Sequence, residues 1–455
     1  MNRKEEYSKL MEEVSQVPPE LAYTVQRAQA RLRTRKRLRK FLGVPVGSVL
    51  VFLVSFTLLV NLLPTFAYAC GRVPVLRELA KAVSWSASLS AAVEHEYVQP
   101  IEQEQTENNV TARVEYVIVD QKQLIIFYSL DSGLYEHLEI MPELHSLSGE
   151  PMEGFSLMYG DYGVPNGELN YLTADFENSM PDGLQLKMQV ADYSHEMDYK
   201  EPEESGILAH PEHEEMEYVA EFTFSLHFDS YYTAQGDRIA VDQDFEIDGQ
   251  TLTLQEAEIY PTHIRLNFTD DPENTAWLKD LEFYLENEEG QRFDPVSNGV
   301  TATGRADSPM MDSFRVESSF FASSKHLTLH ITGATWLDKE REKVELNLRE
   351  CTAEFLPQGV EFIRSEEMKN GWILTFRAPK REESAFYQLW SQTFYDAQGH
   401  SYEIRSWSTG IDPEGGEDTF SQEFPLVGYT EGSVWLEPAF TRMETLTLPV
   451  AVDIR

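Results

Sequence analysis

The most apolar part of the chain is a run without charged residues from Phe41 to Gly71. Its densest stretch, residues 44–63, matches the ~20 residues that a membrane-spanning helix needs. A soluble core helix of this length would show a polar face, and none is evident here. The pattern therefore predicts one transmembrane helix over residues 41–66.

Two short amphipathic helices are predicted before this run. Apolar residues recur at i, i+3, i+4 and i+7 up to Pro18-Pro19, and Pro19-Glu20 suits the start of a second helix. Forty residues do not usually form a core of their own, so both stripes need an external surface, either the inner leaflet or a protein partner. The predicted partner-binding residues are Tyr7, Leu10, Met11, Val14, Leu21 and Val25.

The segment that follows the predicted span reads as a juxtamembrane helix. Over residues 75–98, apolar positions recur at three- and four-residue spacing. Trp85 fits either a tryptophan at the bilayer interface or an ordinary packing face. From about Asn109 the pattern changes to β-branched and aromatic strands separated by turn residues.

Three two-strand units recur in this β-rich part. They cover residues 110–130, 252–268 and 360–376, and we take Leu124, Ile264 and Trp372 as equivalent positions. Their spacing suits β-sandwiches of roughly 100 residues each, with seams near Asp229 and Asp338. The predicted fold class is mainly β outside the membrane, as tandem Ig-like β-sandwiches, with N-terminal cytoplasmic helices, one transmembrane helix and a juxtamembrane helix. The predicted domains are 1–40 (cytoplasmic), 41–66 (transmembrane), 67–105 (juxtamembrane helical), and the sandwiches 106–228, 229–338 and 339–455.

Charge divides the chain at the predicted span. Residues 1–40 hold eleven Lys/Arg and five acidic residues, a formal charge of +6, whereas the rest holds 26 basic and 72 acidic residues, a charge of −46. The positive-inside rule puts the N-terminus in the cytoplasm and the C-terminal portion outside a cell membrane that the chain crosses once. So acidic an outer portion would repel nucleic acid. The predicted topology anchor consists of Arg31, Arg33, Arg35, Lys36, Arg37, Arg39 and Lys40.

Cysteine usage and a processing signal leave two further points open. Cys70 and Cys351 are the only cysteines, which excludes a disulfide framework but leaves open whether these two pair. Ala67-Tyr68-Ala69 fits a signal-peptidase site, although the preceding segments are longer than in a typical signal peptide.

Candidate chemistry in the outer portion is weak. His210–Glu215 could offer metal ligands but reads as a solvated acidic loop, and Asp244–Gly249 fits a hairpin with an Asp-Gly turn better than a calcium loop. Tryptophans in the last domain fit a sandwich core better than a glycan platform. No catalytic motif occurs where its chemistry would need it, so we expect no enzyme, no cofactor and no bound metal.

Several motifs in order resemble one bacterial family. They are Val17–Leu21, Pro64–Ala69 at the end of the span, Val73–Leu76, Tyr97–Pro100 and Val110–Leu130. This layout is similar to the membrane-bound anti-sigma factors of Gram-positive bacteria, whose outer domain of unknown function is often followed by Ig-like domains. The resemblance covers roughly residues 15–130. Residues 1–40 contain no cysteine, unlike the zinc-containing type of anti-sigma domain.

The resemblance implies a signalling role. The cytoplasmic helices would hold an extracytoplasmic-function sigma factor at the membrane, and the outer β-domains would sense an envelope signal, such as a ligand or a protease. The alternative is a structural or ligand-binding protein of the cell envelope, with a cytoplasmic tail that only anchors it in the lipid bilayer.

Overall fold

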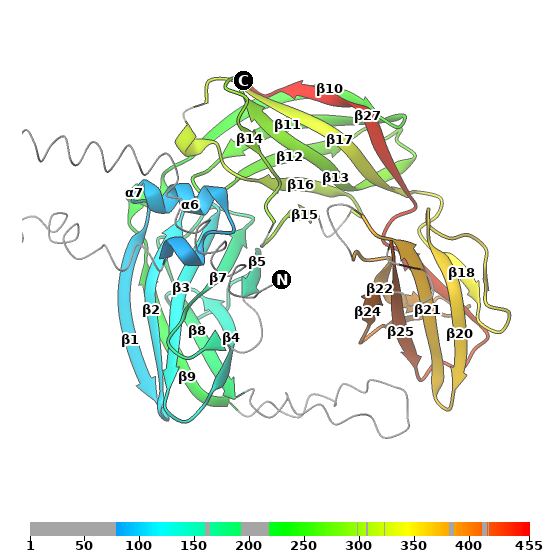
Figure 1. The fold of residues 1–455 in the computed structure, drawn as a ribbon, viewed down its shortest axis with the longest axis horizontal. Coiled ribbons are helices and arrows are strands. Elements are labelled where there is room, and N and C mark those ends of the chain that lie inside the picture. Colours follow the sequence, from blue (N-terminus) through cyan, green and yellow to red (C-terminus); the bar gives the residue numbers. More distant parts are fainter. Residues whose placement is uncertain are drawn as a thin grey trace, which may run out of the picture. The chain divides into compact units, whose positions relative to one another are not determined.

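The computed structural model describes residues 79–455 except 160–163, 193–217, 298, 306–307, 323, 382–385, 412–415 and 417. The predicted cytoplasmic helices and the predicted span lie outside the described residues. None of the helices in the described part is long and apolar enough to cross a bilayer. The described part consists mainly of antiparallel strands, which confirms the predicted β class (Figure 1).

The first sandwich has a five-stranded sheet, in the order β1-β2-β3-β7-β5, and a four-stranded sheet, in the order β6-β4-β8-β9. Apolar side chains alternate inward from both sheets into one core, for example Val114 of β2 and Leu186 of β8. The strands are β1 (Gln99–Glu107), β2 (Val110–Val119), β3 (Gln123–Ser132), β4 (His137–His145), β5 (Phe155–Tyr159), β6 (Val164–Pro165), β7 (Leu169–Phe176), β8 (Gly183–Asp192) and β9 (Tyr218–His227).

The second sandwich repeats this plan. Its sheets have the orders β10-β11-β12-β16-β15 and β14-β13-β17-β27, which follow the two sheets of the first sandwich except at the short edge strands β6 and β14, which come at different places in the sequence. The short helix α7 (Ser230–Thr233) precedes it, and the 3-10 helix η1 (Phe320–Ala322) follows β16. The strands are β10 (Asp237–Ile247), β11 (Gln250–Ile259), β12 (Ile264–Asp270), β13 (Ala276–Asn287), β14 (Arg292–Phe293), β15 (Ala302–Gly304), β16 (Met311–Val316), β17 (Leu327–Asp338) and β27 (Arg442–Asp453).

The third sandwich lies in the sequence between β17 and β27. Its sheet β20-β21-β25-β24 repeats the order β2-β3-β7-β5, and its other sheet has the order β19-β18-β26-β22-β23. The position beside β26 that β9 and β27 take in the other sandwiches is held here by β18, which comes first in the sequence. The strands are β18 (Val344–Asn347), β19 (Thr352–Ala353), β20 (Glu361–Met368), β21 (Gly371–Pro379), β22 (Trp390–Tyr395), β23 (Ser401–Glu403), β24 (Ser408–Ile411), β25 (Thr419–Val427) and β26 (Ser433–Pro438).

The end of the predicted domain 339–455 needs correction. The strand β27 does not join the third sandwich but pairs with β17 of the second, from Thr328↔Asp453 to Trp336↔Arg442 (Figure 1). Val452 and Ile454 belong to the core of the second sandwich. The third sandwich is therefore an insertion in the second, at the place where the first sandwich has the connection from β8 to β9.

Details of the backbone confirm the predicted repeat between Leu124 and Ile264. β1 and β10 each carry a bulge with a left-handed residue, Glu102 at φ 52° and Asp242 at φ 49°. These residues lie 242 − 102 = 140 positions apart, the same offset as between Leu124 and Ile264. The β1–β2 hairpin turns at Asn108-Asn109 and the β10–β11 hairpin at Asp248-Gly249, all with positive φ, as type I′ turns require.

The helix predicted over residues 75–98 is broken in the described part of that range, where residues 79–82 are helical and residues 83–86 are not. The structure has α6 at Ala87–Glu94, where Ser86 begins the helix as N-cap and accepts a hydrogen bond from the Leu89 amide at 3.2 Å. The apolar spacing that predicted one helix over 75–98 runs through this break. The strand β1 already starts at Gln99, so the predicted helical domain 67–105 also ends too late.

A glycine at the start of β21 tests the packing of the third sandwich. A Cβ at Gly371, where φ is 133°, would lie 2.1 Å from the Leu426 carbonyl oxygen, whereas a Cβ at Gly410 would meet no atom within 4 Å. We expect Gly371→Ala to lower the free energy of unfolding of this sandwich by about 2–3 kcal/mol and Gly410→Ala to change it by less than about 1 kcal/mol. Urea unfolding followed by fluorescence of the buried Trp372 and Trp390 measures both, and equal effects would contradict the clash.

Candidate functional site

The turn between β2 and β3 carries Asp120, a fully buried carboxylate that also reaches the second sandwich. Its Oδ1 accepts hydrogen bonds from the backbone amides of Lys122 and Gln123, both at 2.9 Å. Its Oδ2 accepts from the Thr262 amide at 3.2 Å and from the Thr262 hydroxyl at 2.6 Å. Burial raises the pKa of Asp120, and these hydrogen bonds oppose the rise. The turns of two sandwiches are thus joined by one carboxylate.

The next residue, His263, is held in one neutral form. The Thr262 hydroxyl has a single hydrogen and donates it to Asp120, so the contact of 2.7 Å between Thr262 Oγ1 and His263 Nδ1 must be donated by the ring. Nε2 is then the acceptor of the Arg265 Nε–H at 3.0 Å. Burial holds the pKa of His263 well below its ordinary value, and the cations Arg265, Arg315 and Lys122 act in the same direction.

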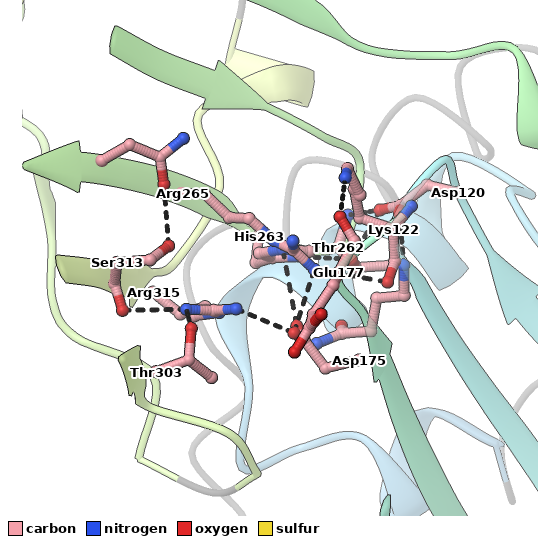
Figure 2. Close-up of polar contacts among 12 residues, drawn as sticks. Asp120, Lys122, Asp175, Glu177, Thr262, His263, Arg265, Thr303, Ser313 and Arg315 are labelled. Atoms are coloured by element: carbon pink, nitrogen blue, oxygen red, sulfur yellow. Dashed lines mark hydrogen bonds and ion pairs between the residues drawn. The ribbon is translucent and has the colours of Figure 1, made fainter. Parts of the chain in front are cut away.

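Asp175, near the end of β7 in the first sandwich, is the counter-charge for two arginines of the second. Its Oδ1 accepts from Arg315 Nη2 at 2.8 Å and lies 3.0 Å from Arg265 Nη2. Arg265 and Arg315 face each other across the β12–β16 pair, where like charges repel without such a partner. All three residues are less than 5% exposed. We call Asp120, Asp175, Thr262, His263, Arg265 and Arg315 the interface cluster (Figure 2).

Polar groups around the interface cluster fix the arginine and lysine side chains. Arg315 Nη1 donates to Thr303 Oγ1 and to the Ser313 carbonyl, both at 2.8 Å. Lys122 donates through Nζ to the Glu177 carbonyl, and its own carbonyl accepts from Arg265 Nη2 at 3.4 Å (Figure 2). Burial, followed by the charge of Arg265, lowers the pKa of Lys122.

A second contact joins α6 to the second sandwich. The Glu317 carboxylate, just after β16, accepts from Ser86 Oγ at 3.0 Å, from the Ser88 amide at 2.6 Å and from the Ser88 hydroxyl. A carboxylate at the first turn of a helix satisfies amides without a partner in the helix and complements the helix dipole. Close by, His95 of the segment after α6 stacks on Phe321 with ring centroids 4.6 Å apart. The segment that follows the predicted span therefore contacts the second sandwich, although in the sequence it directly precedes the first.

The chemistry of the interface cluster favours a role in holding or releasing two sandwiches. Each of its six side chains is less than a tenth exposed, so a substrate has no access to them while the contact is closed. The described residues include no group of three or more histidine, cysteine, aspartate and glutamate side chains that could hold a metal ion. A buried ion pair contributes little net stability compared with an apolar contact, but it makes the arrangement depend on the charge of each member.

The structure describes only some of the residues that the sequence singled out. The predicted partner-binding residues, the topology anchor and His210–Glu215 lie outside the described residues. Asp244–Gly249 forms the β10–β11 hairpin, with Phe245 and Ile247 buried, as predicted. Trp372 and Trp390 fill the core of the third sandwich and Trp407 packs against it, which confirms the prediction for these residues. Trp85 stacks on Tyr171 of β7 with ring centroids 5.3 Å apart.

The interface cluster was missed by reasoning from sequence. Asp120 stands among the turn residues between two predicted strands, and Arg265 and Arg315 look like ordinary outward residues of amphipathic strands. The pattern of β12 gives no signal, because Arg265 and Asn267 alternate with Ile264, Leu266 and Phe268 as the residues of a half-exposed strand do. Asp175, the partner of Arg265, comes from another sandwich, and no local pattern connects the two.

Comparisons with known proteins match two stretches of the chain. Residues 35–132 match a domain of unknown function (DUF4179), and residues 237–360 match a family of unknown function (DUF5643). No curated protein matches the chain. A solved structure described as the conserved domain protein from Bacillus anthracis is 15% identical, with a TM-score of 0.40, over 61% of this chain and 85% of that chain. Asp120 thus lies in the first matched stretch, and Thr262, His263, Arg265 and Arg315 lie in the second.

Proposed function

We propose that this chain is a transmembrane anti-sigma factor. Its cytoplasmic residues 1–40 would sequester an extracytoplasmic-function sigma factor, and its outer β-domains would receive an envelope signal. The observation that carries this proposal is the pair of apolar stripes in a segment too small to cover them, separated by an uncharged run from an acidic outer portion. A protein partner satisfies the first stripe better than lipid does, because Glu5, Glu6, Glu12 and Glu13 accompany that stripe.

The comparisons support the proposal in one respect. The stretch 35–132 that matches a domain of unknown function runs from the basic cluster through the uncharged run into β3. It lies mostly within residues 15–130, over which the chain resembles membrane-bound anti-sigma factors. Five of the seven residues of the basic cluster, the predicted span and the first hairpin thus lie within one matched domain.

The strand order supports the Ig-like part of the proposal. In an Ig constant-type sandwich, strands A-B-E-D form one sheet and C-F-G the other. The first sandwich has β2-β3-β7-β5 in one sheet and β4-β8-β9 in the other, which is the same order when β2 is taken as A. The second sandwich follows it with β11-β12-β16-β15 and β13-β17-β27. Many cell-surface domains share this sandwich architecture, which suits an outer portion that receives a signal.

The test is co-purification of a sigma factor with the full-length protein from membranes of its own host. We expect Leu10→Asp to weaken the complex by about 2–3 kcal/mol, roughly 30–150-fold in affinity, because it puts a charge into an apolar contact. The matched control is Gln16→Asp, which adds the same charge on the opposite face of the first predicted helix.

Two outcomes would sink the proposal. Either no sigma factor accompanies the unaltered protein, or Leu10→Asp and Gln16→Asp weaken the complex equally. The chain would then fit the alternative of a structural or ligand-binding envelope protein. Protease protection of the N-terminal tail in intact cells checks the orientation separately, since a cytoplasmic tail must resist added protease.

A further inference from the structure

The interface cluster places a histidine where only its neutral form fits. His263 is fully buried, its Nδ1–H donates to Thr262 and its Nε2 accepts from Arg265. A second proton would go to Nε2, where it would face the Arg265 Nε–H at 3.0 Å and would remove that hydrogen bond. The nearest carboxylate oxygen, Asp175 Oδ2, lies 3.9 Å from Nε2, beyond hydrogen-bond distance.

Charged side chains surround His263 on each of the strands and turns packed against it. Arg265 of its own strand and Arg315 of β16 are cationic, and Lys122 approaches from the β2–β3 turn. Asp175 of β7 is already shared by Arg265 and Arg315, and Asp120 accepts four hydrogen bonds from the two turns. The Tyr260 ring lies 5.5 Å from the His263 ring, and the carboxylate of Glu258 stands near the end of β11, two residues before Tyr260. The charges that act on His263 directly are thus the three cations Arg265, Arg315 and Lys122.

We propose that the contact between the first and second sandwiches is an acid-sensitive latch, which opens when His263 takes up a second proton. The anionic partners come from the first sandwich, whereas the histidine and both arginines belong to the second. Separation would rehydrate the imidazolium and both arginines, which the buried contact cannot do. The latch goes beyond the anti-sigma role and does not depend on it.

The direction of the pH effect follows from the lowered pKa of His263. A group whose pKa is lower in the closed state stabilises that state above its free pKa, and this contribution is lost as the pH falls. A free histidine has a pKa near 6.5. Lowering the pH from about 7.5 to about 5.5 therefore decreases the ratio of closed to open molecules about tenfold. This window is where a histidine, rather than a carboxylate, ordinarily titrates.

Asp120 acts with the opposite sign. Its pKa is raised by burial, so its contribution to the closed state is fully present below the ordinary aspartate pKa and is lost as the pH rises through the raised value. Protonation of Asp120, as the pH falls through that range, therefore stabilises the closed contact. A variant without His263 should show this opposite trend or no trend at all, which separates the two groups experimentally.

Hydrogen–deuterium exchange of the full chain in detergent micelles tests the latch. Two amides report on the contact at separate places, Thr262, which donates to Asp120, and Ser88, which donates to Glu317. After correction for intrinsic exchange, we expect both to lose protection about tenfold at the lower pH. The amides of Leu374 and Phe376, paired with β25 in the third sandwich, serve as the internal reference and should keep theirs.

Two variants at buried histidines decide the cause. His263→Gln keeps an acceptor for Arg265 but cannot titrate. In this variant the amides of Thr262 and Ser88 should therefore keep their protection at low pH. The control is His145→Gln, which removes another buried histidine, inside the first sandwich, and should behave as the unaltered protein does. Loss of protection in His263→Gln equal to that of the unaltered protein would overturn the latch, as would full protection of the unaltered protein at low pH. Loss at Thr262 without loss at Ser88 would also overturn it, because that pattern means fraying of one turn.

A further variant covers the case in which His263→Gln does not fold. Thr262→Val retains His263 and removes the hydroxyl bond to Asp120, so the contact is weakened and should open at a higher pH than in the unaltered protein. An unchanged opening pH in Thr262→Val would contradict the assignment of the latch to this contact.

Discussion

Replacing Asp175 by asparagine is expected to weaken the contact between the first and second sandwiches by about 3–5 kcal/mol, because two buried arginines lose their counter-charge. Asp175 Oδ1 lies 2.8 Å from Arg315 and 3.0 Å from Arg265, and all three side chains are almost inaccessible to water. A guanidinium, unlike an imidazole, has no neutral form at ordinary pH, so titration offers no escape from an uncompensated buried charge of this kind. The only relief is to expose the arginines, which requires the sandwiches to part.

Amide exchange at Thr262 and the urea midpoint of the first two sandwiches measure this effect. Asp131→Asn is the matched control, since it makes the same change at an exposed position of the same sheet and should leave both quantities unchanged. A companion variant that replaces Asp175, Arg265 and Arg315 together by leucine or methionine should restore much of the contact, because a buried ion cluster and an apolar one of similar volume are close in stability. If Asp175→Asn behaved like Asp131→Asn, the interface cluster would not be what holds the contact.

A chain that ends at Thr441 is expected to lose the second sandwich and to keep the third. The truncation removes β27 and with it Val452 and Ile454 from the core, each worth about 1.5–3 kcal/mol of burial. It also leaves one edge of β17 without its hydrogen-bonded neighbour. Together these losses approach the about 5–15 kcal/mol by which a whole domain is stable. The third sandwich contributes its own strand, β18, at the corresponding position, and of β27 only the partly buried Met443 packs against its core.

Limited proteolysis with mass spectrometry distinguishes the two sandwiches after truncation. Fragments should arise within β10–β17, while residues of β20–β26 stay protected. The matched control removes far more of the chain, residues 340–440, and joins Lys339 to Thr441 through a short flexible linker. This variant should retain a protected second sandwich, because β17 and β27 can still pair. Protection of β10–β17 in the chain that ends at Thr441 would contradict the pairing of β27 with β17.

Local patterns predicted the hairpins because hairpins are local. The β2–β3 pair needs only two β-branched runs and the turn at Asp120, and the β20–β21 pair needs the turn at Asn370-Gly371. The offset between Leu124 and Ile264 was visible because strands and bulges recur with it. The mainly β class follows from the same evidence.

The features that were missed depend on contacts between distant residues. The alternating residues of β27 fit the edge of any sandwich, so nothing within that strand tells whether it joins β17 or β26. The break before α6 depended on one residue, Ser86, inside an apolar spacing that continues past it. Asp175 and Arg315 are 140 positions apart, and a single charged residue in a strand reads as solvated unless its partner is known.

The return of β27 to the second sandwich also sets an order for biosynthesis. As the polypeptide leaves the ribosome, the first sandwich and then the third have all their strands before β27 has emerged. Until that moment the second sandwich has an uncovered edge at β17 and an incomplete core. This middle domain, which carries His263 and both arginines, is therefore the last of the three to mature, and it is the one that newly made chains expose to chaperones and to wrong partners.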